Sequence, residues 1–209
     1  MCDIYTFDLY ESFFFIKQDN LSYPGCWAYP DMLQVGCQHG PGGKSDPGLN
    51  AEETRTHFAA WCIVSSPLTL SHDVNNATIM AEIWDVISNT EAIAVNQAYV
   101  GDSGGVYATS AETVTLTDAF IEASAYETAV TTPKSQYLSK PLGGGKVAVL
   151  LMNSDSAKAT LSTTFASIPG VTCTDCNVRD IWAHKDLGKK TGSVSVDVET
   201  HDAAFLIIG

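Results

Sequence analysis

The sequence has few basic residues, and this shortage restricts the partners that it can bind. Its 209 residues include 11 lysines and arginines against 24 aspartates and glutamates, a formal charge of −13 at pH 7. Proteins that bind phosphate backbones need clustered basic side chains to displace counterions. The most basic pair, Lys189-Lys190, lies beside a glycine turn, as a solvated surface pair would. We therefore expect neither nucleic acid nor an anionic membrane as a partner, whereas a neutral ligand is compatible with this charge.

Long hydrophobic runs are also missing. No stretch approaches the roughly 18 apolar residues that a membrane-spanning helix needs. The apolar run Ser12–Ile16 is short and follows Asp8 and Glu11, whereas an export signal carries positive charge there. We expect neither an anchor nor a signal peptide in this chain. Hydrophobic residues still make up 45% of it, as in a packed globular protein.

The cysteines and histidines do not form a complete zinc-binding pattern. Cys173 and Cys176 have the C-x-x-C spacing, but no second such pair and no histidine pair completes a site. This favours a local structural pair or two unlinked thiols over a metal, and we expect neither a metal nor another cofactor. Cys26 and Cys37 bracket a loop and are candidates for a disulfide, whereas Cys62 lies in a helical pattern as a small buried residue.

Two sequons for asparagine-linked glycosylation occur, at Asn20-Leu21-Ser22 and at Asn76-Ala77-Thr78. Because such triplets often arise by chance, they add only slight weight to a secretory route.

The residue pattern changes at Gly101–Gly105, a glycine, serine and aspartate stretch typical of a domain boundary. Upstream, the short apolar strands Met32–Val35 and Pro67–Leu70 each precede a helical pattern. The first helix is expected to begin after Asn50, with Glu53 completing an N-terminal cap. Apolar residues recur at helical spacing in both: Phe58, Trp61 and Cys62 in the first, and Ile79, Met80, Ile83, Trp84 and Ile87 in the second. This order predicts an α/β unit with parallel strands, too short to be complete.

The downstream half predicts an all-β domain. Short segments of alternating or continuous apolar residues are expected as strands at 113–117, 146–152, 158–165, 178–182, 194–198 and 203–208. Turns are expected at Gly143–Gly145 and at Asp186–Gly188. Strands of this length and spacing indicate an antiparallel β-sandwich.

Two carboxylates fall where an α/β protein places its functional groups, at the carboxyl ends of strands. Asp31 lies beside the first strand and Asp73 follows the second, and the aromatic residues Trp27 and Tyr29 lie close to Asp31 in sequence. Carboxylates beside aromatic faces suit a sugar pocket. In the alternative interpretation, Asp31 only caps a turn after Pro30 and Trp27 belongs to the core.

Longer motifs resemble one enzyme family. The segment Trp27–Gly36 resembles the W-x-x-P-D-M-L-x-x-G signature of the melibiase-type α-galactosidases, glycoside hydrolase family 27. Further matches follow in the family's order: Glu52-Glu53, His57-Phe58, Trp61, Ser66-Pro67-Leu68, Asp73, Asn89, Glu91, Val95-Asn96-Gln97, Lys146–Asn153, Val178–Trp182 and His201. The resemblance runs from about Gly25 to the C-terminus.

The resemblance implies the C-terminal piece of a TIM (β/α)8 barrel followed by an antiparallel β-sandwich. It also implies retaining hydrolysis of terminal α-linked galactose, in which two carboxyl groups act as nucleophile and as acid/base. In the family both aspartates lie on earlier barrel strands. The resemblance does not extend to the family's K-x-D segment, and no R-x-x-x-D segment precedes Trp27. We therefore expect no catalytic residue in these 209 residues and no hydrolysis by them alone.

The sugar-contacting residues carried over from the family are Asp31 and Met32, at the end of the seventh barrel strand, with Trp27 and Tyr29 beside them. Family members commonly read W-N-D-P-D-M-L, whereas this chain has Ala28 and Tyr29 in place of the asparagine and the first aspartate. This departure leaves β-L-arabinopyranosidase activity open, since the two sugars differ by one hydroxymethyl group. A catalytically inactive carbohydrate-binding module is a further alternative.

The expected domain limits are 23–101 for the barrel part and 106–209 for the sandwich. Residues 1–22 resemble nothing in the family and stay unassigned, and an incorrect gene-model start would explain them. The resemblance implies a secreted, lysosomal or vacuolar protein and a galactoside or related glycoside as substrate.

Overall fold

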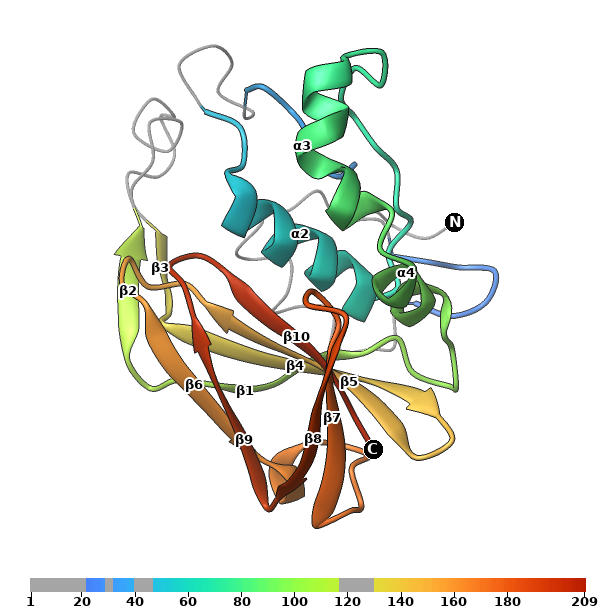
Figure 1. Cartoon of the computed structure of the whole chain (residues 1–209), viewed down its shortest axis with the longest axis vertical. Coiled ribbons are helices and arrows are strands. Elements are labelled where there is room, and N and C mark those ends of the chain that lie inside the picture. The colour runs from blue at the N-terminus through green and yellow to red at the C-terminus, as the bar shows by residue number, and fades with distance from the viewer. Residues whose placement is uncertain (1–21, 29–31, 40–46, 117–129) are drawn as a thin grey trace.

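The computed structural model describes residues 22–28, 32–39, 47–116 and 130–209, which form a helical part packed on a β-sheet part (Figure 1). The helical part holds α2 (Ala51–Ile63), α3 (Ala77–Ile87) and α4 (Thr90–Gln97). In the part of the chain described, no helix combines the length and the apolar character that a bilayer crossing requires.

Helix α2 begins at the predicted cap. The Asn50 side chain accepts a hydrogen bond from the Glu53 backbone N–H, and the Glu53 carboxylate accepts one from the Asn50 N–H, both at 2.9 Å. These reciprocal bonds satisfy two amides that have no partner inside the helix. The second half of α2 is buried on all sides, whereas α3 is amphipathic, with Ile83 buried and Trp84 54% exposed.

The two predicted upstream strands are parallel neighbours, as expected, but they pair at a single position. Leu33 and Leu70 form an isolated parallel bridge, in which the Leu33 N–H donates to the Thr69 carbonyl at 2.8 Å. The chain then turns into α2 after the first segment and into α3 after the second. This is the strand–helix order of an α/β barrel, represented here by two adjacent units.

The sheet part is antiparallel throughout, as predicted. Its main sheet has the order β1-β4-β5-β10-β7-β8, which comprises Gly105–Thr109, Ser135–Gly143, Lys146–Asn153, Ala203–Ile208, Asp175–Asp180 and Lys185–Thr191. Two smaller sheets pair β6 (Ala159–Thr164) with β9 (Ser193–Val198) and β2 (Thr113–Leu116) with β3 (Val130–Pro133). The short 3-10 helix η2 (Phe165–Ser167) follows β6.

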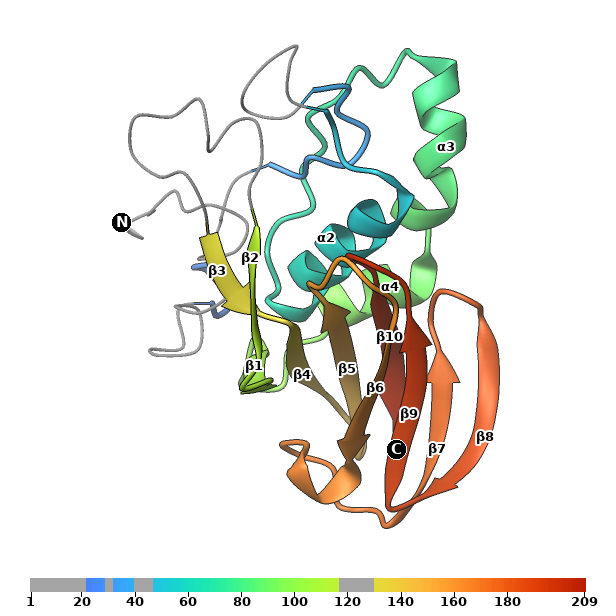
Figure 2. The same cartoon turned by 90° about the vertical axis from the view of Figure 1, so that its left-hand side faces the viewer.

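The main sheet is covered on both faces (Figure 2). Alternate residues of its central strands point to opposite sides. Leu150 and Phe205 pack with the helices in one core, whereas Val149 and Leu206 pack with β6 and β9 in a second core. This double burial explains why β5 is an almost unbroken apolar run. The molecule therefore has three layers: helices, main sheet and the β6–β9 pair.

One predicted turn is wrong. Asp186–Gly188 lies within strand β8, and the chain reverses instead at residues 181–184. The register between β7 and β8 shifts at Val178/Arg179, where the pairing passes from Gly188 to Asp186. This irregularity accommodates the glycine inside the strand. The turn at Gly143–Gly145 is confirmed, since all three glycines have positive φ angles, of 81°, 61° and 79°.

A buried lysine joins the helical part to the sheet part. Lys140 of β4 is fully buried, and its ammonium group donates to the backbone carbonyls of Val95 (2.5 Å), Asn96 (2.9 Å) and Cys62 (3.3 Å). These carbonyls lie in the last turns of α4 and α2, where helix carbonyls lack partners and the helix dipole is negative. Burial lowers the pKa of Lys140 to about 8, so the ammonium form still predominates at neutral pH.

Further polar contacts fix the helices at other points. The Arg55 guanidinium of α2 contacts Asp202 at 2.6 Å. At the start of α4, Glu91 accepts two hydrogen bonds from Arg179 of β7, at 2.6 and 2.8 Å. Hydrogen bonding to Arg179 is the main reason why the pKa of Glu91 falls to about 2. The helices are thus fixed to the sheet at both ends of α2 and at both ends of α4.

Replacing Lys140 by methionine should lower the free energy of unfolding by roughly 2 to 4 kcal/mol. The apolar side chain leaves buried carbonyls without donors, and each such group costs about 1–3 kcal/mol. Urea unfolding followed by tryptophan fluorescence measures the change. Lys146→Met is the matched control, because Lys146 is exposed at the start of β5. Equal stabilities of the two variants would contradict the role given to Lys140.

Candidate sugar-binding site

The predicted site residues are only partly described. Tyr29 and Asp31 lie outside the described residues. Trp27 and Met32 lie on either side of them and are 37% and 44% exposed. The Trp27 ring makes an edge-to-face contact with Tyr99, with ring centroids 5.5 Å apart. Tryptophan rings and methionine side chains are types that often contact ligands, and both residues are partly exposed near the strand end.

Three side chains hold the backbone that follows Met32. The Gln34 N–H donates to His57 Nε2 of α2 at 3.1 Å, and the Ser71 hydroxyl donates to the Leu33 carbonyl. His72 Nδ1 contacts the Val35 carbonyl at 2.9 Å. We call these three residues the backbone clamp. The sequence alone assigned no role to any of them, although His57 was among the matches to the family. Ser71 and His72 stand directly after the second strand, so their position at a strand end was the available signal.

Gly36 allows the clamp to close. Its φ angle is +79°, and a Cβ atom there would lie 2.9 Å from both His72 Nδ1 and Ile83 Cδ1. Any other residue would need a strained backbone and would push His72 away from the Val35 carbonyl. This explains why a glycine ends the motif Trp27–Gly36.

His57 is held in its neutral form. It is 3% exposed, and its ring packs on Trp61 with centroids 4.0 Å apart. Burial lowers its pKa to about 3. Because Nε2 accepts the Gln34 hydrogen bond, the proton of the neutral ring is assigned to Nδ1. Protonation of Nε2 would remove the acceptor and break the bond to the strand.

Asp73, the second predicted carboxylate, has a local role in the structure. Its Oδ1 accepts hydrogen bonds from the Asn75 backbone at 2.9 Å and from the Asn75 side chain at 3.2 Å. Such bonds stabilise the turn that leads into α3. Across the described ranges, no group of three or more acidic, histidine or cysteine side chains is arranged to hold a metal ion.

A cavity of about 710 Å³ lies near the same strand ends, between the residues after the first strand and the starts of α2 and α3. Cys37, His39, Thr54, Asn76 and Glu82 are among its lining residues. Trp27 and Met32 do not line it. Of the predicted sugar-contacting residues, the two that the structure describes therefore lie outside this cavity.

The predicted Cys26–Cys37 disulfide is wrong. Cys37 is a free thiol whose sulfur lies 3.2 Å from the Ser71 hydroxyl, whereas Cys26 is disulfide-bonded elsewhere. The Cys37 N–H donates to the Gln34 carbonyl in a tight turn. This turn places Cys37 beside the end of the second strand, where Ser71 lies. The predicted burial of Cys62 is confirmed, with no exposed surface.

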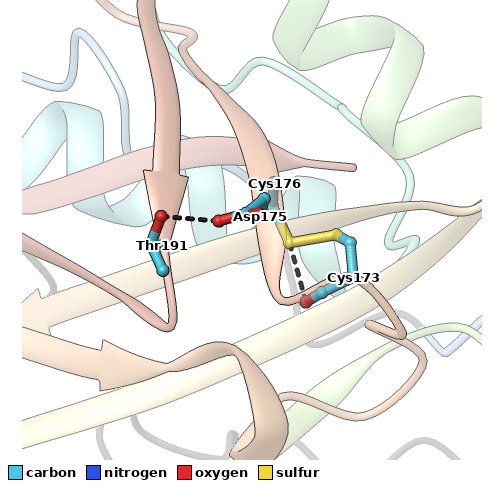
Figure 3. The surroundings of a disulfide bond; sticks show 4 residues. All are labelled: Cys173, Asp175, Cys176 and Thr191. Carbon is cyan, nitrogen blue, oxygen red and sulfur yellow. Dashed lines mark hydrogen bonds between the residues drawn. A yellow bond between two sulfur atoms is a disulfide. The ribbon is translucent and has the colours of Figure 1, made fainter.

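The local C-x-x-C pair is a disulfide, one of the two outcomes that the sequence favoured over a metal site (Figure 3). Cys173 and Cys176 are bonded, with Cα atoms 5.5 Å apart. Cys176 is buried at the start of β7, and Asp175 beside it accepts a hydrogen bond from Thr191 of β8 at 2.5 Å. The disulfide therefore ties the residues just before β7 to the first residues of that strand, at the open end of the β7–β8 hairpin.

Neutral His57 should make the fold less stable in acid. Its pKa is about 3 when folded and 6.5 when exposed, so between these pH values the unfolded chain binds a proton that the native state does not. Stability is then fully present above pH 6.5 and falls by about 1.4 kcal/mol per pH unit below it. His57→Gln, which keeps an acceptor oxygen, should flatten this slope in urea unfolding at several pH values. The exposed control His39→Gln should retain it, and parallel slopes for wild type and His57→Gln would disprove the assignment.

Comparison with known proteins agrees with the fold. Residues 8–98 match the family model described as alpha galactosidase A, and residues 132–208 match the alpha galactosidase C-terminal beta sandwich domain. The first match begins inside the segment 1–22 that the sequence left unassigned. Alpha-galactosidase 3 of Arabidopsis thaliana is 32% identical over 88% of this chain and 36% of its own length. The alpha-galactosidase of Cyamopsis tetragonoloba is 28% identical over 88% and 37%, respectively.

Solved structures show the same arrangement. Alpha-galactosidase I of Mortierella vinacea has a TM-score of 0.64 and 27% identity, over 87% of this chain and 39% of that chain. The alpha-galactosidase of Saccharomyces cerevisiae with raffinose has a TM-score of 0.61 and 20% identity, over 88% and 47%. The chain thus spans less than half the length of each of these relatives. With both family models matched in order, barrel before sandwich, the chain belongs to glycoside hydrolase family 27.

Proposed function

We propose that this chain forms the last part of the (β/α)8 barrel and the sandwich of a retaining glycosidase that removes terminal α-D-galactosyl residues. The observation that carries this proposal is the ordered match to the two α-galactosidase family models. The parallel Leu33–Leu70 bridge supports it, because the family resemblance expects two adjacent barrel strands there.

We propose that hydrolysis needs two carboxyl groups that these 209 residues do not supply. In a retaining mechanism one carboxylate attacks the anomeric carbon and forms a glycosyl-enzyme. The second protonates the leaving oxygen and then activates water. The family resemblance assigns both to barrel strands upstream of Gly25. The chain spans only 36% of the length of the Arabidopsis relative. In this proposal the earlier barrel strands correspond to the part of the relative that the chain does not cover.

In this proposal, residues Trp27, Tyr29, Asp31 and Met32 form one wall of the sugar subsite. The Asp31 carboxylate would accept hydrogen bonds from sugar hydroxyls, and the Trp27 ring would pack against the apolar face of the sugar. The exposure of Trp27 and Met32 supports this role, since both are large apolar side chains at one strand end.

Two other activities have weaker support. A β-L-arabinopyranosidase from Geobacillus stearothermophilus has a TM-score of 0.68 but 18% identity, which is evidence for the fold alone. The substitution of Ala28 and Tyr29 in the family motif is the residue-level reason to test this sugar. An inactive carbohydrate-binding module would need no upstream carboxylates, and it predicts sugar binding without turnover.

We further propose that the protein passes through the secretory pathway, to the outside or to a vacuole or lysosome. Cys26 is disulfide-bonded and Cys173 is bonded to Cys176, and such bonds persist in oxidising compartments. For the domain limits we propose 23–101 and 106–209, supported by strand β1, which begins at Gly105 and pairs with β4 of the main sheet.

The purified 209-residue chain should not hydrolyse nitrophenyl α-D-galactoside or nitrophenyl β-L-arabinopyranoside. Both assays depend on release of nitrophenol, and the chain is expected to lack the nucleophile and the acid/base. Turnover above the buffer rate by the purified chain, retained through a further purification step, would refute the assignment of both carboxylates to an upstream segment.

A chimera should recover activity. We would fuse the upstream barrel segment of the Arabidopsis relative to residues 25–209 and measure kcat/KM for both nitrophenyl glycosides. The galactoside should be the better substrate, and preference for the arabinoside would favour the alternative sugar. A folded chimera that binds galactose without hydrolysing either glycoside would instead support the binding module.

In the active chimera, Asp31→Asn should reduce kcat/KM by roughly 10- to 100-fold, since a hydrogen bond to a charged group is worth about 1.5–3 kcal/mol. Glu199→Gln removes a carboxylate from the sandwich surface, where Glu199 pairs with Lys158, and is the matched control. Unchanged kcat/KM in Asp31→Asn would remove Asp31 from the sugar subsite.

A further inference from the structure

The sequon Asn76-Ala77-Thr78 occupies an accessible place in the fold, in the turn between the second strand segment and α3. Ala77 and Thr78 are exposed and Asn76 is half-buried. We propose that Asn76 carries an N-linked glycan, an inference that rests on the proposed secretory route. The other sequon, at Asn20, lies outside the described residues.

The hydrogen bonds of Asn76 leave its reactive nitrogen available. Asn76 is the N-cap of α3, and its Oδ1 accepts hydrogen bonds from the backbone N–H groups of Thr78 (3.1 Å) and Ile79 (3.3 Å). Among the described residues, no acceptor pairs with Asn76 Nδ2 and no partner occupies the Thr78 hydroxyl. The amide oxygen of Asn76 thus stabilises the start of α3, and its amide nitrogen remains available for reaction.

The modification is compatible with the cap. In the transfer, the Asn76 Nδ2 forms a bond to the anomeric carbon of an oligosaccharide and loses one proton. The bond from that carbon to a lipid-linked diphosphate breaks, and the diphosphate leaves with the electron pair. A lipid-linked oligosaccharide and its transferase are the co-reactants. Because Oδ1 is untouched, the product keeps both hydrogen bonds that start α3.

The surroundings have room for a sugar. Asn76 and Thr78 both line the cavity of about 710 Å³, together with His39 and Glu82, so protein atoms do not fill the space beside the amide. Val74, two residues earlier, is 58% exposed. A glycan at Asn76 would cover apolar surface near this turn and increase solubility.

The test is expression of the full 209-residue chain behind a cleavable secretion leader in a yeast. Leader-cleaved protein is collected from cells and medium, so that export failure does not affect the result. Peptide-N-glycosidase should then shift the mass of wild type and of Asn20→Gln. Tryptic mass spectrometry should find the Asn76 peptide glycosylated.

Two variants separate the modification from the cap. Asn76→Asp keeps a side-chain acceptor for the Thr78 and Ile79 amides but removes the reactive nitrogen, so in the Asn20→Gln background it should abolish the shift without unfolding α3. Thr78→Ser keeps the sequon and should retain the glycan. An unmodified Asn76 peptide in leader-cleaved wild-type protein, or a shift that persists in the Asn76→Asp/Asn20→Gln double variant, would overturn the proposal.

Discussion

The ammonium group of Lys140 is the contact on which the arrangement of the two parts depends. Helices α2 and α4 both end against the main sheet, and their last carbonyls point into a region from which water is excluded. Such carbonyls need donors, and three of them converge on one nitrogen, at 2.5 to 3.3 Å. A lysine on β4 can reach them because its long apolar stem crosses the core between sheet and helices. One side chain of the sandwich thereby fixes the ends of two helices of the barrel part.

The fixed position of α2 is passed on to the strand end that carries the proposed sugar contacts. Lys140 holds the C-terminal end of α2, and the Arg55–Asp202 pair holds its first half against the β9–β10 turn. Between these points α2 presents His57, whose Nε2 binds the Gln34 N–H. Lys140 and Asp202 of the sandwich do not themselves contact residues 33–35. They fix the position of α2, and α2 carries the His57 side chain that binds the backbone of these residues. A contiguous series of hydrogen bonds thus links β4 to the wall of the proposed subsite.

Features that depend on residues close in sequence were predicted, whereas features that depend on neighbours in space were not. The capping box at Asn50 and the strand β5 depend on residues close in sequence, and both were predicted. Strands β1, β3, β4 and β8 were not predicted. Strand β8 lacks an apolar pattern, because it is polar and exposed at every residue except Leu187. Lysine usually indicates surface, so nothing in the sequence revealed that Lys140 is buried between two helix ends. Cys37 was a candidate partner for Cys26 because the two bracket a loop, whereas in the fold its sulfur lies beside the Ser71 hydroxyl.

The clamp and the departure from the family motif lie in different parts of the strand end. His57, Ser71 and His72 bind backbone groups after Met32. A Cβ atom on Gly36 would collide with His72. Ala28 and Tyr29 come before Met32, in the part that we propose contacts the sugar. A change there alters the chemistry offered to a ligand without removing a hydrogen bond that holds residues 33–35. The backbone of residues 33–35 is therefore held by side chains other than those that we propose contact the sugar.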